Sequence, residues 1–149
     1  MKRILMITGT ILVVLSGVVY AMQRDNPAPY SAEEYIQFLT IEELYAGRGN
    51  VGETTGMPIV WFKVRNNGVS TIEHIQVTVE FLNDENQVVF EKKLHPVHQG
   101  RESGEPVQPL GPNEVWQMSA IRYYIVRQVP HTWQLGNVRA KITEIEFKT

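Results

Sequence analysis

The sequence predicts an all-β domain, an immunoglobulin-like β-sandwich of about seven antiparallel strands, preceded by one N-terminal hydrophobic (signal-anchor) helix. Three observations support this prediction. Apolar and polar residues alternate with a period of two from Pro58 onward, which is typical of strands with one buried face. Turn-forming residues interrupt the alternation at short intervals. The first 22 residues instead form a nearly continuous apolar stretch behind two charges.

Residues 1–22 have the pattern of a membrane-targeting segment. Lys2 and Arg3 precede an uncharged stretch, Ile4 to Met22, that approaches the ~20 apolar residues of a spanning helix. A retained signal anchor and a cleaved signal peptide both fit, because Val19-Tyr20-Ala21 offers small residues to a peptidase. In either case the N-terminus stays in the cytoplasm and the rest is exported, by the positive-inside rule.

Composition restricts where the exported part works and what it binds. The chain of 149 residues contains no cysteine, which excludes disulfides, thiolate zinc sites and a cysteine nucleophile. Export without disulfides favours a bacterial inner-membrane protein with its domain in the periplasm or outside, or a soluble periplasmic or secreted protein if the segment is cleaved. Without Lys2 and Arg3, the chain has 12 basic and 16 acidic residues. Because this part is acidic, nucleic acid is not an expected partner.

The exported part divides into a linker, residues 23–34, and one domain, residues 35–149. Pro27 and Pro29 favour an extended spacer in the linker. The segment Ser31-Ala32-Glu33-Glu34 matches a helix-capping pattern, although the residues that follow also alternate acceptably as a strand. Both readings stay open here, and the β-branched and aromatic content favours a first strand from Tyr35 to Leu44.

The alternation is clearest in two consecutive strands. In the first, three apolar residues alternate with three larger or charged ones: Val60, Phe62 and Val64 against Trp61, Lys63 and Arg65. This strand ends at Asn66-Asn67-Gly68, residues that tolerate a positive φ. In the second, inward-facing apolar residues alternate with outward-facing polar ones: Ile75, Val77, Val79 and Phe81 against His74, Gln76, Thr78 and Glu80.

The remaining elements follow from their turn residues. A polar turn at residues 83–87 precedes a strand from Val88 to His95-Pro96. Gly and Pro residues between Val97 and Asn113 predict a long loop. Strands are expected at Val115 to Val126 and Val138 to Phe147, and a change of apolar phase in the last one predicts a bulge near Thr143.

Several of these segments together resemble the FxLYD-type domains, small immunoglobulin-like modules of exported bacterial proteins. The resemblance rests on Phe62-x-Val64-x-Asn66-x-Gly68, Ile75-x-Val77-x-Val79-x-Phe81-Leu82-Asn83 and Leu110-x-Pro112, with the closing segments Val129-Pro130-x-x-Trp133 and Ile142-Thr143-Glu144-Ile145-Glu146-Phe147. It covers roughly residues 35–147. It implies a fold and an envelope location, and it carries over no catalytic residues.

The sequence contains partial matches to phosphate-binding, metal-binding and acid–base motifs, but none of them is complete. Residues 47–54 contain Gly-x-Gly-x-x-Gly, but Glu53 stands where a phosphate-binding loop needs lysine, so an inter-strand loop is expected. His95 and His98 flank Pro96 and could at most form a weak metal site. The pairs Glu33-Glu34 and Glu42-Glu43 would point to opposite faces of a strand. We therefore expect no enzyme activity, no metal and no cofactor.

Exposed aromatic residues are the remaining candidates for a binding site. Trp61 is on the outward register of its strand, and Arg122, Tyr123 and Tyr124 follow one another in a later strand. These residues predict part of a partner-binding face in a non-catalytic, membrane-tethered module that binds or scaffolds another envelope protein. The alternative is a periplasmic carrier that holds a small apolar ligand or lipid between its sheets. The oligomeric state does not follow from the sequence.

Overall fold

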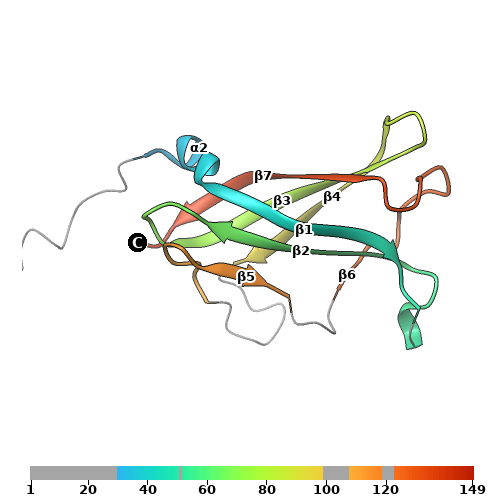
Figure 1. The fold of residues 1–149 in the computed structure, drawn as a ribbon, viewed down its shortest axis with the longest axis horizontal. Helices are drawn as coiled ribbons and strands as arrows, with labels where there is room; N and C mark the ends of the chain where they lie inside the picture. Colours follow the sequence, from blue (N-terminus) through green and yellow to red (C-terminus); the bar gives the residue numbers. More distant parts are fainter. Residues whose placement is uncertain (1–29, 51, 99–107, 119–122) are drawn as a thin grey trace, which may run out of the picture.

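The computed structural model describes residues 30–50, 52–98, 108–118 and 123–149, and seven strands within them form two antiparallel sheets (Figure 1). In the first sheet, β2 (Pro58–Asn66) pairs on one side with β1 (Leu39–Arg48) and on the other with β5 (Val115–Gln117) and β6 (Tyr124–Ile125). In the second sheet, β3 (Ile72–Leu82) lies between β4 (Val88–Val97) and β7 (Val138–Phe147). The prediction of a mostly β, sandwich-like fold is confirmed, whereas the expected N-terminal helix lies outside the described residues.

The core lies between the inward faces of the two sheets, where the predicted alternation is observed. Phe62 and Phe81 are among the largest fully buried side chains, one from each central strand. The predicted bulge is also present: Gln76 pairs with Glu144 and Val77 with Ile142, which leaves Thr143 as the extra residue of β7. The change of phase in the sequence therefore marks a real irregularity of the strand.

The outer face of β3 is polar, as predicted, but its middle is almost completely covered. Gln76, Thr78 and Glu80 expose 9% or less of their surface. The hydroxyl of Thr143 accepts a hydrogen bond from Gln76 Nε2 (2.8 Å) and lies 3.1 Å from Thr78 Oγ1. Glu80 pairs with Lys141 Nζ (2.6 Å), so long side chains of β7 cover the central strand and satisfy its polar groups.

The start of the domain differs from the preferred prediction, because a strand does not begin at Tyr35. Ser31 caps a short helix, α2 (Ala32–Tyr35): its hydroxyl accepts from Glu34 N, and Glu34 accepts in return from Ser31 N (2.9 Å). A 3₁₀ turn, η1 (Ile36–Phe38), follows, and β1 begins at Leu39. The capping box outweighs the strand propensity of the residues after it, since it satisfies the otherwise unpaired amides. Residues 31–34, assigned to the linker by the sequence, take part in this helix.

The turn after β2 is built around a buried amide rather than around a positive φ. Asn66 is fully buried, and its Nδ2 donates to the carbonyls of Ser70 (2.8 Å) and Gly111 (3.1 Å). Its Oδ1 accepts from the Tyr35 hydroxyl (3.0 Å) and from Gly68 N (3.0 Å). None of Asn66, Asn67 and Gly68 has a positive φ. Gly68 is required instead because a Cβ there would overlap the Tyr35 ring.

A second difference concerns the predicted strand from Val115 to Val126. Among the described residues of this region, 115–118 and 123–126, the structure contains two short strands, β5 and β6, and both pair with β2. β5 lies opposite Lys63 to Arg65, and β6 lies opposite Ile59 and Val60. The edge of the first sheet beyond β2 is therefore made of two separate pieces.

Candidate functional site

Of the residues that the sequence proposed as one binding face, the structure places Tyr124 on the inward side of the first sheet. Tyr124 pairs with Val60 on the inward side, and its ring stacks on Phe62 with centroids 5.7 Å apart. This burial raises the pKa of the Tyr124 hydroxyl. Trp61 lies on the opposite, outer face of the same sheet, and Tyr123 is 41% exposed just before β6. Arg122 lies outside the described residues.

Trp61 has apolar neighbours on the outer face that sequence reasoning missed. Tyr45 is its partner on β1 and is 53% exposed. Ile59, two residues before Trp61, pairs with Ile125 of β6, which is 39% exposed. We call these four residues, Tyr45, Ile59, Trp61 and Ile125, the aromatic patch. It is assembled from three strands, β1, β2 and β6.

A glycine on β1 sets the position of the Tyr45 ring. A Cβ at Gly47 would overlap the Tyr45 ring, so the ring lies over the bare backbone two residues further along the strand. Gly47 is also the register partner of Ile59. The pattern Tyr-x-Gly was visible in the sequence, but the predicted strand ended at Leu44 and left both residues in a loop.

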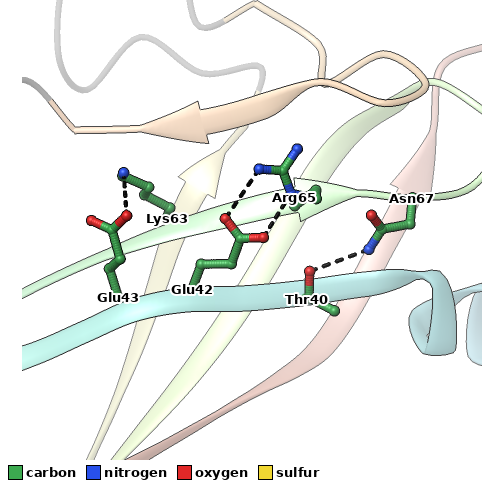
Figure 2. Close-up of polar contacts among 6 residues, drawn as sticks. All are labelled: Thr40, Glu42, Glu43, Lys63, Arg65 and Asn67. Carbon is green, nitrogen blue, oxygen red and sulfur yellow. Dashed lines mark hydrogen bonds and ion pairs between the residues drawn. The ribbon is translucent and has the colours of Figure 1, made fainter.

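Beside the aromatic patch, the same face carries two ion pairs between β1 and β2, which Figure 2 shows. Glu42 accepts from Arg65 Nε (2.6 Å) and Nη2 (3.3 Å), and Glu43 accepts from Lys63 Nζ (2.6 Å). We call these four residues, Glu42, Glu43, Lys63 and Arg65, the charged band. The hydrogen bond from Arg65 holds the pKa of Glu42 below its usual range. Lys63 Nζ also lies 5.6 Å from the centroid of the Trp61 ring and so joins the two surfaces.

A β-bulge brings both carboxylates to the outer face. Glu42 pairs with Lys63 and Tyr45 pairs with Trp61, so the two residues between them, Glu43 and Leu44, stand opposite one residue of β2. Glu43 adopts φ 52° at this bulge. The expectation that neighbouring glutamates point to opposite faces is therefore wrong here, because it assumed a regular strand. Each carboxylate is engaged by a cation.

The glycine-rich segment forms the connection between β1 and β2. Gly49 N donates to Met57 O (2.9 Å) and Gly56 N donates to Gly49 O (2.8 Å), which closes the loop on itself. Its described residues include a three-residue 3₁₀ turn, η2 (Gly52–Thr54), too short to supply the helix that a phosphate-binding loop needs. The predicted inter-strand loop is therefore confirmed for residues 49, 50 and 52–54, whereas Gly47 and Arg48 belong to β1.

The structure gives His95 a histidine neighbour that the sequence did not suggest. The ring of His95 lies 5.2 Å from that of His74 on the neighbouring strand, whereas His131 is exposed in the segment before β7. Partial desolvation of the exposed His95 side chain, together with the charges of His74 and His98, lowers its pKa. Across the described ranges, no group of three or more His, Asp or Glu residues could hold a metal ion.

The described helices are short: none of those in residues 30–149, outside the gaps, is long and apolar enough to cross a membrane. The apolar segment Ile4 to Met22 lies outside the described residues. No protein-family model, curated protein or solved structure matches the chain.

Proposed function

We propose that the chain is a non-catalytic, membrane-tethered extracytoplasmic module of immunoglobulin-like fold that binds another envelope protein through the outer face of its first sheet. The observation that carries this proposal is the aromatic patch, where Tyr45 and Ile125 are exposed beside Trp61. The apolar segment Ile4 to Met22 supplies the tether.

The strand order supports an immunoglobulin-like fold. Immunoglobulin sandwiches place strands A, B and E in one sheet and C and F in the other, with C′ beside C in variable-type domains. The sheet of β1, β2 and β5 with β6 has the order of A, B and E. The sheet of β4, β3 and β7 has the order of C′, C and F.

Two of the sheet edges, those formed by β4 and β1, are less suited to a partner than this face. On the edge strand β4, Lys92 is the register partner of the core-facing Val79 and is nevertheless exposed. This edge strand therefore carries a charged side chain at an inward-facing position. Pro96 removes a backbone donor from the same edge. On the other side of the sandwich, β1 carries its bulge and lies against β7. These features discourage the addition of a strand and favour binding through a sheet face.

The composition of the face indicates the kind of partner. Tyr, Trp and Arg are the residues most often found at the energetic centre of protein interfaces, usually with a polar rim. The charged band supplies such a rim, and its two acids and two bases neutralise each other. A partner surface that is apolar and weakly charged would match it.

The alternative function, carriage of a small apolar ligand or lipid between the sheets, receives less support. The space between the sheets is occupied by the chain's own side chains, including fully buried Tyr35, Phe62 and Phe81. Trp133 packs edge-on against Phe81 with ring centroids 5.3 Å apart. A core filled in this way favours the interaction module.

Affinity purification tests the proposal. The full-length chain with a C-terminal tag is extracted from membranes in mild detergent, and co-purifying proteins are quantified by mass spectrometry. A stoichiometric partner should be recovered with the parent chain, and Trp61→Ala or Tyr45→Ala should reduce its recovery by ~30-fold, the effect of losing about 2 kcal/mol at a hot spot. The matched controls Val88→Ala and Leu135→Ala remove exposed apolar side chains elsewhere and should retain it. Equal recovery with all four variants would contradict the proposed face.

A further inference from the structure

The described chain begins at one end of the domain. Figure 1 shows α2, the β2–β3 turn and the C-terminus at one end of the long axis. The β3–β4 turn and the segment before β7 lie at the opposite end. We call the first the α2 end; Tyr30, the first described residue, lies there because its ring contacts Phe38 at a centroid distance of 4.9 Å.

The α2 end exposes apolar side chains. Val69, in the β2–β3 turn, is 71% exposed, the largest value for a large hydrophobic residue in the described ranges. Tyr30 is 38% exposed and lies over Phe38 and Tyr35. A tyrosine ring of this kind has an apolar body and a polar tip, which suits the boundary between lipid and water.

Tyr35 connects Tyr30 to the turn that carries Val69, because it contacts the Tyr30 ring and the residue that follows Val69. The Tyr35 hydroxyl accepts from Ser70 N (2.8 Å), next to Val69, and donates to Asn66 Oδ1 (3.0 Å). The Tyr35 ring also meets the Phe147 ring edge-on, with centroids 5.2 Å apart. These contacts tie α2 and the β2–β3 turn to the end of β7.

The chain before Tyr30 limits how far this end can lie from a membrane anchor. The apolar stretch ends at Met22, and the seven residues 23–29 separate it from Tyr30. At ~3.3–3.6 Å per residue, these residues span at most about 25 Å. A retained anchor therefore keeps the α2 end within this distance of the bilayer, whichever way the rest of the domain turns.

Resting on the tether of the proposed function, we propose that the α2 end docks on the bilayer surface, with the Tyr30 ring and the Val69 side chain in the lipid headgroup layer. The acidic residues of α2, Glu33 and Glu34, give no attraction to anionic lipid. Docking therefore depends on apolar contact and should not require anionic headgroups. It leaves the aromatic patch, whose Tyr45 lies beyond the charged band on β1, available to a partner.

Site-specific fluorescence tests the docking, and the absence of cysteine from the chain allows one introduced thiol to be labelled at a time. Full-length Val69→Cys is reconstituted in phosphatidylcholine vesicles and labelled from outside with a polarity-sensitive dye. Leu135→Cys, 58% exposed in the segment before β7, is the matched control. A quencher attached to lipid headgroups should quench the dye at position 69 several-fold more strongly than at position 135.

The outcomes separate the docking from the tether on which it rests. If the chain floats with the vesicles but both positions are quenched equally, the docking is wrong and the tether stands. Quenching confined to vesicles that contain anionic lipid would also overturn docking by apolar contact. If the chain does not float, the anchor itself is wrong and the docking fails with it. The double variant Tyr30→Ser/Val69→Ser should still float. A dye on Gln37→Cys, in η1, should be quenched less in the double variant than in the chain that carries Gln37→Cys alone.

Discussion

At the scale of single residues, Asn66 and Asn67 show how position decides what the same side chain does. Asn66 is fully buried and its amide links α2, the β2–β3 turn and the segment before β5 through Tyr35, Ser70 and Gly111. Asn67 is exposed, and its side chain donates to Thr40 Oγ1 (3.2 Å), as Figure 2 shows. A buried amide with several partners is costly to remove because each partner loses its hydrogen bond away from water.

We predict that Asn66→Ala lowers the free energy of unfolding by about 3 kcal/mol or more, because it leaves buried donors and acceptors unpaired. Asn67→Ala, one residue further along, should change it by about 0.5 kcal/mol or less, as expected of an exposed residue. Chemical denaturation of both purified variants measures the difference. Similar losses in the two variants would show that the Asn66 network does not stabilise the fold.

At the scale of elements, strands were predicted correctly from the sequence where the alternation was regular. The prediction was wrong where tertiary contacts determine the local structure. β2, β3 and β7 were predicted because their inward residues recur at every second position, and the bulge at Thr143 because that pattern shifts. The first strand was misplaced because Tyr35 is needed in α2, where its hydroxyl reaches Asn66. Nothing local to residues 35–38 indicates that long-range contact.

Lys92 on the edge strand β4 provides a test of how this element avoids self-association. It stands on the inner register, opposite Val79, and is nevertheless exposed. We predict that Lys92→Val promotes dimers or larger species, since it removes a charge that a second strand would have to bury. Lys93→Val, on the outer register opposite Thr78, should have a weaker effect. Light scattering coupled to size exclusion compares the two, and equal association would argue against a role for the inner position.

At the scale of the whole molecule, the candidate site could be predicted only in part because it is assembled from separate strands. Trp61 was identified from the sequence by its outward register, and Tyr123 as one of two adjacent aromatics. Tyr45 and Ile125 become neighbours of Trp61 through the pairing of β1 and β6 with β2. The charged band additionally depends on the bulge at Glu43. No local sequence pattern predicts this bulge.

The stability of the whole molecule should fall in two separate steps as the pH is lowered. Partial desolvation and the charges of His74 and His98 lower the pKa of His95, whose side chain is otherwise exposed, so the folded state favours neutral His95. The stability associated with this preference is present above the ordinary histidine value of about 6.5 and is lost as the pH falls through the lower folded value. Glu144 on β7 opposes the shift and Lys93 reinforces it.

The second step belongs to the carboxylates and lies at lower pH. The hydrogen bond from Lys141 lowers the pKa of Glu80, and the contacts of Ser31 and Arg65 do the same for Glu34 and Glu42. Their stabilisation is present above the ordinary value of about 4.5 and disappears as the pH falls through their lower folded values. Thermal unfolding between pH 8 and pH 3 should therefore show His95→Gln without the upper step and Glu80→Gln with a reduced lower one. Because His95 lies near the end of β4, beside His74 at the start of β3, whereas Glu80 lies near the end of β3, each variant should leave the other step intact. A melting temperature that stays flat from pH 8 to pH 5 in the parent chain would contradict the assignment to His95.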